Sequence, residues 1–215
     1  MYVRNRMTKE VICVDVNAKV SDVVDLMNEH HLHRLPVVSG KKLVGLVTES
    51  MISKKGAFSA TSLSIYELNY LLSKTSVDAI MIRDVITVHE ERYLEDAALL
   101  MFQHDIGCLP VVNDDYQVVG ILTSNDVLKS YLDLIGYRNT GSRVCIEVKD
   151  EVGTVKELSK IFVNHNCNIT HLGVYNKHNG YADMIIRVDT YQTSALEEEL
   201  VANGYKILDI TKNPG

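Results

Sequence analysis

The sequence has no tryptophan, three prolines and three phenylalanines, and no apolar run approaching the roughly 18 residues of a membrane span. Its first six residues, Met1 to Arg6, contain no apolar segment of the kind that an export signal requires. These absences predict a cytoplasmic protein that does not enter a membrane. Because 46% of the 215 residues are hydrophobic, the chain has enough apolar material to build well-packed cores.

Charge and cysteine content narrow the function further. The net charge is −6 and no basic run exceeds two residues, so bulk electrostatic binding to nucleic acid is not expected. Any phosphate would have to be held by a local cluster. The four cysteines, Cys13, Cys108, Cys145 and Cys167, lie far apart and form no C-x-x-C motif. Buried, reduced thiols are therefore favoured over metal or redox chemistry.

Motifs that carry catalysis are also missing. The sequence offers no Ser or Cys nucleophile with an evident base, no Gly-rich phosphate loop and no close set of histidine and carboxylate ligands. His165, His171 and His178 are too widely spaced to suggest a metal site, so surface or hydrogen-bonded roles are expected for them. We predict a protein that is not an enzyme and that has neither a metal site nor a catalytic cofactor.

The chain contains an internal sequence repeat of two copies. Residues Met7 to Ile52 match residues Met81 to Val127, with MTKEVICVDV answered by MIRDVITVHE and LPVV repeated in both. The offset is 74 residues at Met7 and Met81 and 75 at Gly45 and Gly120, which one insertion in a turn explains. Two copies are too few for an open solenoid, so the pattern predicts two half-domains that complete one another by packing face to face.

Each copy reads as strand, helix, strand, strand, helix. A short β-branched run opens it, around Val11 to Val14 and Val85 to Val88. Leu-Pro-Val-Val follows the helix, and proline belongs at the entrance or edge of a strand because it cannot donate to the ladder. The helix is predicted from apolar positions spaced i, i+3, i+4, i+7. These positions are Val20, Val23, Val24 and Met27 in the first copy and Leu94, Ala97, Ala98 and Met101 in the second.

This pattern resembles the cystathionine β-synthase (CBS) domain, whose copies form pairs that sense nucleotides. The resemblance assigns residues 1–58 to the first copy and 76–135 to the second, with a connecting helix and linker over 59–75. It implies an α/β fold in which the two copies are related by a pseudo-twofold axis. The segment between the two copies and the order of domains resemble those of the acetoin-utilisation B-type proteins, which join such a pair to a C-terminal domain.

The family motif for adenosine ligands places a threonine and, three residues later, an aspartate whose carboxylate accepts both ribose hydroxyls. The second copy has Thr123 and Asp126, whereas the first has Thr48 followed by Met51. A carboxylate suits a diol because it offers two coplanar acceptor oxygens. The same Thr-x-x-Asp pattern is also a capping box at a helix start. Both interpretations stay open from the residues alone, and the matched repeat favours ribose binding.

Basic residues are expected to hold the phosphates. The first copy has His31, His33 and Arg34 before Leu-Pro, where the second has glycine and cysteine in place of His33 and Arg34. The resemblance therefore predicts one asymmetric site for AMP, ADP, ATP or S-adenosylmethionine, acting as a regulatory ligand. The predicted base pocket comprises Ile86, Thr87, Cys108, Leu109 and Pro110. The alternative for the basic residues is an ordinary solvated helix end.

A polar linker at 136–142 separates the two copies from a segment with a different pattern. Residues 143–215 are predicted to form the order β-α-β-β-α-β, which is the ferredoxin-like order. Asn179-Gly180 predicts a type I′ hairpin turn. This segment resembles the ACT domain, a small regulatory module. Asp150 and Gly153 match the first loop of that family, although Val152 replaces its proline, and Asn168 matches an asparagine before the second strand. The resemblance implies either amino-acid binding at these three residues or dimerisation through side-by-side sheets.

The leading hypothesis is a homodimeric, non-catalytic regulator that senses an adenosine-containing ligand and modulates a partner enzyme. The resemblance to the acetoin-utilisation proteins implies a role in acetoin or related carbon metabolism. An adaptor that binds no metabolite and an amino-acid sensor that uses the CBS pair as a scaffold are the alternatives.

Overall fold

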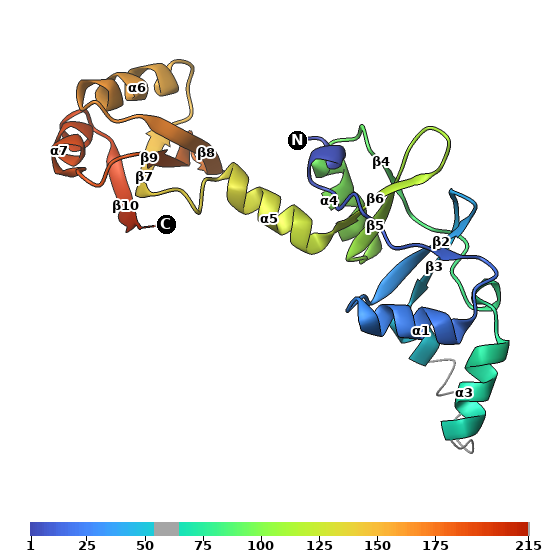
Figure 1. Cartoon of the computed structure of the whole chain (residues 1–215). Helices are drawn as coiled ribbons and strands as arrows, with labels where there is room; N and C mark the ends of the chain where they lie inside the picture. The colour runs from blue at the N-terminus through green and yellow to red at the C-terminus, as the bar shows by residue number, and fades with distance from the viewer. Residues whose placement is uncertain (54–64, 215) are drawn as a thin grey trace. The chain divides into compact units, whose positions relative to one another are not determined.

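A computed structural model of the chain describes residues 1–53 and 65–214 (Figure 1). The first copy contains β1 (Val14–Asp15), α1 (Val20–Glu29), β2 (Arg34–Ser39) and β3 (Lys42–Thr48), and residues 49–53 begin a helix. Its sheet has the order β1-β2-β3, with β1 parallel to β2 and β3 antiparallel to it. The helix α3 (Ile65–Lys74) precedes the second copy, and the predicted boundary at 58/59 lies outside the described residues.

The second copy repeats this order with β4 (Val88–His89), α4 (Leu94–His104), β5 (Cys108–Val112), β6 (Val118–Thr123) and α5 (Ser124–Leu134). Its sheet order, β4-β5-β6, matches the first copy, and a register shift falls at the equivalent place in both hairpins. The predicted element order is therefore confirmed in both copies.

The first strand of each copy is shorter than the pattern predicts. Val11 and Ile12 precede β1, which pairs only with Val37 and Val38. The pairing of β1 with β2 begins at Val37, so Pro36 has no partner in β1 on that side of β2. Proline is tolerated there because it has no N–H to donate to a neighbouring strand. The residues before β1 are engaged elsewhere, because they cross to the other copy.

The leading segment of each copy pairs with the last strand of its twin. Thr8 exchanges two backbone hydrogen bonds of 2.9 Å with Ile121 of β6. Leu46 of β3 likewise exchanges bonds of 2.9 and 2.8 Å with Ile82. The crossing is symmetric, so each half-domain receives a strand segment that the other half supplies.

Glycines at equivalent positions permit this crossing. A Cβ on Gly120 would overlap the Sδ of Met7, and a Cβ on Gly45 would overlap the Sδ of Met81.

The hydrophobic core of each copy also contains residues from the leading segment of the other copy. Val77, Ile80 and Met81 are buried in the core of the first copy, whereas Val3 is fully buried in the core of the second. The apolar contacts thus tie the two copies into one body.

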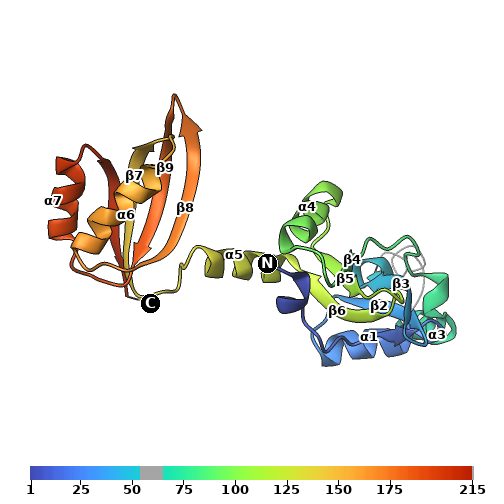
Figure 2. The same ribbon diagram turned by 90° about the horizontal axis from the view of Figure 1, so that it is seen from above.

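The C-terminal segment forms one four-stranded antiparallel sheet with the order β10-β7-β9-β8. Helices α6 and α7 lie on the same side of the sheet, and their apolar residues share one core with alternate residues of β7 and β9 (Figure 2). The elements are β7 (Gly141–Lys149), α6 (Thr154–Asn164), β8 (Ile169–His178), β9 (Tyr181–Val188), α7 (Ser194–Ala202) and β10 (Lys206–Asn213). The predicted β-α-β-β-α-β order is confirmed.

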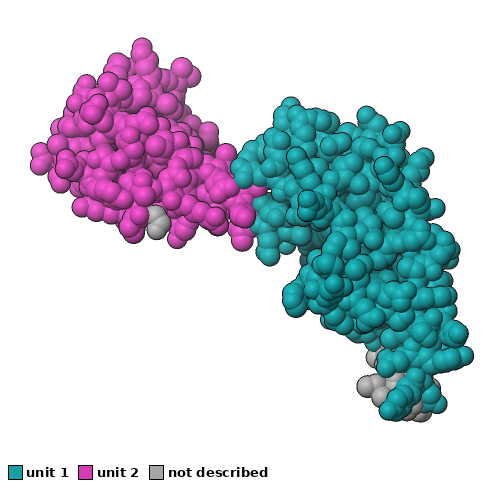
Figure 3. All heavy atoms as spheres, viewed as in Figure 1, with its two compact units in different colours: residues 1–127 teal, residues 128–215 magenta. Residues whose placement is uncertain are grey.

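The turn between β8 and β9 has the backbone that its sequence predicts. Asn179 has φ of 48° and Gly180 has φ of 79°, the pair of positive values that a type I′ turn requires. By contact density the chain divides into residues 1–127 and 128–215 (Figure 3). We call these unit 1 and unit 2 and describe each by itself.

Candidate functional site

Two clefts in the described part of unit 1 are each lined by parts of both copies. The Thr123 cleft has a volume of about 410 Å³ and is lined by Thr8 to Ile12, His31 to Leu35, and Thr123 to Asn125. The Thr48 cleft has a volume of about 450 Å³ and is lined by Thr48 to Ser50, Asp84 to Ile86, and Asp105 to Cys108. Both volumes lie in the range of roughly 300–1,000 Å³ that is typical of small-molecule sites.

The crossed leading segments decide which residues meet. Because Thr8 pairs with β6, the residues that follow it, including Val11 and Ile12, are brought to the cleft beside Thr123. The equivalent pairing of Ile82 with β3 brings Val85 and Ile86 to the cleft beside Thr48. Thr123 and Thr48 therefore each line a cleft together with the leading segment of the other copy.

The residues of the predicted base pocket do not line the cleft that contains Thr123. Ile86 and Cys108 line the Thr48 cleft. Leu109 is fully buried in the second core, Pro110 is also buried, and among the described residues Thr87 lines neither cleft. The prediction grouped residues by copy, whereas the crossing exchanges the leading segments between copies.

Asp126 and Thr123 form a capping box at the start of α5. The Asp126 carboxylate accepts a 2.8 Å hydrogen bond from the Thr123 backbone N–H and a 2.7 Å bond from its hydroxyl, both through Oδ2. In return the Asp126 N–H donates to Thr123 Oγ1 at 3.2 Å. The capping role is thus present in this structure. Asp126 is not among the described residues that line the Thr123 cleft, and its connection to that cleft is the bond with Thr123.

The equivalent corner of the first copy lacks an acid. The Thr48 hydroxyl lies 3.1 Å from the hydroxyl of Ser50 and accepts a 3.4 Å bond from the Met51 N–H. Methionine offers no oxygen to a diol, so this corner cannot bind a ribose in the way that a carboxylate does.

The basic residues lie where the clefts adjoin. His33 and Arg34 line both clefts, whereas His31 lines only the Thr123 cleft. His33 Nδ1 lies 2.7 Å from Glu49 Oε2. The half-buried guanidinium of Arg34 reaches the start of α5, because a Cβ on Gly107 would lie 3.8 Å from Arg34 Nη1 and 3.5 Å from Ser124 Oγ. A cation at a helix N-terminus is a suitable place for an anion.

Cys108 lies on the wall beside Arg34. Burial raises the pKa of its thiol, and the nearby Arg34 guanidinium partly counteracts that rise. Burial likewise raises the pKa of the thiols of Cys13 and Cys167. All four cysteines are free thiols in this structure. Cys108, Cys145 and Cys167 are buried, and Cys145 Sγ also lies 3.3 Å from the hydroxyl of Tyr175.

The charges of the two clefts differ. Glu49, Asp84 and Asp105 line the Thr48 cleft, where Arg34 is the permanent cation. The Thr123 cleft has one carboxylate in its lining, that of Glu10, together with Arg34 and the histidines 31 and 33. A phosphate is therefore repelled more strongly from the Thr48 cleft.

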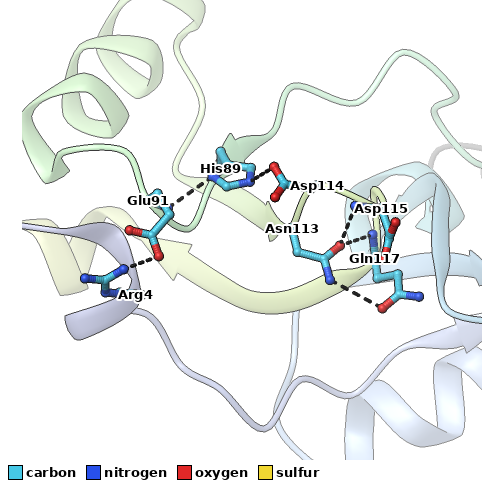
Figure 4. A network of polar contacts seen from close by, with 7 residues as sticks. All are labelled: Arg4, His89, Glu91, Asn113, Asp114, Asp115 and Gln117. Carbon is cyan, nitrogen blue, oxygen red and sulfur yellow. Dashed lines mark hydrogen bonds and ion pairs between the residues drawn. The ribbon is translucent and has the colours of Figure 1, made fainter.

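A third polar cluster in unit 1 has a structural role. Arg4, in the leading segment, forms an ion pair with Glu91, whose backbone N–H donates to His89 Nδ1 at 3.2 Å (Figure 4). His89 Nε2 in turn lies 3.1 Å from Asp114, in the turn between β5 and β6. The side chain of Asn113 closes that turn by accepting from the N–H groups of two residues further along, Asp115 and Gln117. These contacts hold the leader and the turn on the second copy.

The candidate residues of unit 2 do not meet within one chain. Asp150 follows β7 and forms an ion pair of 3.0 Å with Lys177, and Gly153 precedes α6 with φ of 102°. Asn168 lies at the opposite end of the sheet, where its N–H donates to Asp189 at 3.1 Å. A site that used all three would need a second copy of the chain.

The three histidines of unit 2 are hydrogen-bonded, as predicted, to different partners. His165 lies 2.6 Å from Glu199, and His171 lies 3.2 Å from Thr170. His178 lies 3.2 Å from Glu147, close to Asp183. In the described part of the chain, no helix is both long and apolar enough to cross a bilayer.

Unit 1 is a paired repeat whose halves exchange backbone hydrogen bonds and jointly line two clefts. The sequence profile of the CBS domain matches residues 3–56 and 77–133, which is more than half of the chain. The chain therefore belongs to the CBS-domain family.

Relatives of known structure include ligand complexes. The CBS domain pair of protein MJ0100, solved with 5′-methylthioadenosine and S-adenosyl-L-methionine, is 30% identical with a TM-score of 0.51, covering 61% of this chain and 99% of that one. CBSX2, solved with AMP, is also 30% identical with a TM-score of 0.51, covering 61% and 96%.

Curated relatives match over the same region. Protein MJ1225 of Methanocaldococcus jannaschii is 34% identical over 130 residues, covering 58% of this chain and 45% of that protein. The chain spans less than half the length of the first curated relatives that it matches.

Proposed function

We propose that the chain is a non-catalytic regulatory protein that binds an adenosine-containing ligand in the Thr123 cleft. One observation carries the proposal. A single cleft of about 410 Å³ combines Thr123, whose capping partner is Asp126, with His31, His33 and Arg34. The basic residues of the first copy therefore line the same cavity as the threonine that bonds to the acid of the second copy, an arrangement that suits a ligand with a sugar and a phosphate.

The ligand is proposed to lie with its ribose hydroxyls on Asp126 and its phosphate toward Arg34. A carboxylate suits a diol because its two oxygens accept hydrogen bonds in one plane. Arginine offers a planar fork of donors that matches phosphate oxygens. The base would then lie against the half-buried side chains of Val11, Ile12 and Leu32, in place of the pocket around Ile86 that the sequence predicted.

One site per chain is proposed, since the Thr48 cleft lacks a ribose acid and is the more acidic of the two, although His33 and Arg34 line it as well. Met51 stands where the ribose acid would be, and three carboxylates line that cleft. AMP, ADP, ATP and S-adenosylmethionine are the proposed regulatory ligands, supported by the AMP complex of CBSX2 and the S-adenosylmethionine complex of the MJ0100 pair.

Calorimetric titration of adenosine and AMP into the wild type and Arg34→Ala tests the phosphate assignment. We expect Arg34→Ala to weaken AMP binding by about ten- to 100-fold, since a charge-assisted bond contributes roughly 1.5–3 kcal/mol, and to leave adenosine binding nearly unchanged. Arg92→Ala is the matched control, because Arg92 is exposed and lines neither cleft. Equal loss of adenosine and AMP would contradict the assignment.

Regulation is proposed to act through the relative arrangement of the two copies. A ligand shifts that arrangement only if it binds two arrangements with different affinity, typically by about 1–3 kcal/mol. The output would be the activity of a partner enzyme. A role in acetoin or related carbon metabolism is proposed from the resemblance in the linking segment and domain order. It is supported by similarity to the structure of a putative acetoin utilization protein from Vibrio cholerae, which is 28% identical with a TM-score of 0.51. The cytoplasmic location is proposed from the composition.

We further propose that residues 143–215 are an ACT domain that pairs two chains. Its β-α-β-β-α-β order supports this, and so does its edge strand β8, on which Leu172, Val174 and Tyr175 are each at least 41% exposed. Antiparallel pairing of two β8 edges would bring Asn168 of one chain toward the Asp150 end of the other. Light scattering should report a dimer that Val174→Lys weakens.

An amino-acid sensor and a ligand-independent adaptor remain the competing functions. A thermal-shift panel of adenosine phosphates, S-adenosylmethionine and amino acids separates them. A ligand at 100 times its dissociation constant stabilises the folded chain by about 2.7 kcal/mol, which is a visible shift. Response to amino acids alone would favour the sensor, and no response would favour the adaptor.

A further inference from the structure

The face of the unit 2 sheet that α6 and α7 leave uncovered carries a mixed histidine and carboxylate cluster. Glu147 on β7 and Asp183 on β9 are direct cross-strand partners, and His178 ends the neighbouring strand β8. One ligand atom from each of the three lies within 4.8 Å of the other two. Asp183 is only 8% exposed, so its carboxylate is held in place by the sheet around it.

The hydrogen bonds of His178 direct its Nε2 toward Glu147. Its Nδ1 lies 2.7 Å from the carbonyl oxygen of Asn176, which can only accept, so Nδ1 carries a proton. Nε2 lies 3.2 Å from Glu147 Oε2, and the hydrogen bonds to Asn176 and Glu147 raise the pKa of His178. A metal ion bound at Nε2 would take the place of the proton in this contact.

The carboxylates are oriented by further contacts. Asn176 donates its side-chain amide to Asp183 at 2.7 Å. Lys206 lies 3.3 Å from Glu147 Oε1, which leaves Oε2 directed toward His178. A backbone carbonyl on the far nitrogen of a histidine and donors on the ligating carboxylates are the outer contacts that metal sites in proteins regularly have.

We propose that Glu147, His178 and Asp183 bind a divalent transition-metal ion of the Zn²⁺ type. One imidazole nitrogen and two carboxylate oxygens suit Zn²⁺, Co²⁺ or Ni²⁺ better than Mg²⁺ or Ca²⁺, which take oxygen ligands. In a tetrahedral site with bonds of about 2.1 Å, ligand atoms stand about 3.4 Å apart. The contact between His178 and Glu147 already meets this spacing, and all three ligand atoms lie within 4.8 Å of one another, so binding needs shifts of about 1 Å.

Such an ion would join three adjacent strands at the end of the β8–β9 hairpin. It would offset the negative charge of a nearly buried Asp183, for which the described contacts supply an amide donor, Asn176. Three protein ligands would leave a coordination position for water or for a ligand atom.

Equilibrium binding of Zn²⁺ to the full chain, measured by competition with a chromophoric chelator, tests the proposal. His178→Gln is the main variant, because His178 is exposed enough to be replaced without disturbing the core. His171→Gln is the matched control, since His171 lies on the same strand outside the cluster. A titration with Mg²⁺ at equal concentration checks the preference for a transition metal. Any background binding of Zn²⁺ would come from histidines 30, 31 and 33.

We expect the wild type and His171→Gln each to bind one equivalent of Zn²⁺ with the same affinity. His178→Gln should bind Zn²⁺ at least about tenfold more weakly. Asp183→Asn should show the same loss, with circular dichroism confirming its fold. Bound Co²⁺ should give visible absorption that disappears in His178→Gln. Equal Zn²⁺ affinity in all variants, or no binding by the wild type, would overturn the proposal. Since the variants lie in unit 2, the outcome is independent of adenosine binding in unit 1.

Discussion

Replacement of Asp126 separates its capping role from its proposed ligand role. In Asp126→Ala the Thr123 N–H and hydroxyl lose acceptors at 2.8 and 2.7 Å. Loss of a helix cap costs about 1 kcal/mol, and loss of a negative charge near the start of α5 costs about 0.3–1 kcal/mol more. We expect the variant to lose about 1–2 kcal/mol of stability without ligand, which lowers Tm by about 2–8 °C in a chain of this size.

The effect on ligand binding should be larger than the effect on stability. Two hydrogen bonds from ribose hydroxyls to a carboxylate contribute about 1.5–3 kcal/mol each, so Asp126→Ala should weaken adenosine at least about 100-fold. Calorimetry gives the affinity and differential scanning fluorimetry gives the Tm, both on the full chain. At an adenosine concentration of 100 times the wild-type dissociation constant, the ligand-induced Tm shift of the variant should almost disappear.

Asp22→Ala provides the matched control for this experiment. Asp22 also lies in the first turn of a helix, α1, but lines neither cleft. It should show a small loss of stability and unchanged adenosine affinity. The reasoning is refuted if Asp126→Ala loses stability as expected but binds adenosine as tightly as the wild type, because Asp126 would then be a cap alone.

Two further predictions concern the fold. Gly120→Ala should cost about 1–3 kcal/mol because its Cβ overlaps Met7, and the double mutant with Met7→Ala should show a coupling energy of about 1 kcal/mol in denaturant unfolding. Gly173→Ala, which meets no atom within 4 Å, is the control, and equal cost in both glycine variants would contradict the crossed packing. Because burial raises the pKa of Cys108, the stability it contributes is complete below the unfolded thiol pKa of about 8.5 and is lost as pH rises above it. The fall in Tm between neutral and alkaline pH should therefore be smaller in Cys108→Ser than in the wild type, and an unchanged fall would show that this thiol does not contribute.

The sequence predicted the local structure of this chain because periodicity reports which face of an element is buried. The stripe Val20, Val23 and Met27 is buried in α1, and Asn179-Gly180 forms the expected turn. Repetition also predicted that the two copies would complete one another. These features depend on neighbours within a few residues, so a single chain without homologues is enough to find them.

The exchange of leading segments was not predicted, and for this reason Ile86 and Cys108 were grouped with Thr123 although they line the other cleft. Whether Thr8 pairs with its own last strand or with Ile121 is a long-range choice that no local pattern encodes. One signal was present, because each copy pairs a leading methionine with a later glycine, Met7 with Gly45 and Met81 with Gly120 in sequence order. In space those partners are exchanged.

The cluster at His178 was missed for a similar reason. Glu147 and Asp183 are 36 residues apart in numbering and become neighbours only through the register of β7 and β9. The available signal was strand parity. Both are acidic residues between core positions, Ile146 and Val148 on one strand and Ala182 and Met184 on the other, which places them on the same uncovered face.

A crystal structure of the full chain with AMP tests the central claim most directly. We predict one AMP per chain, with its ribose hydroxyls within hydrogen-bonding distance of Asp126 and its phosphate against Arg34. Density for AMP beside Met51 in the Thr48 cleft, with the Thr123 cleft left to solvent, would contradict the account.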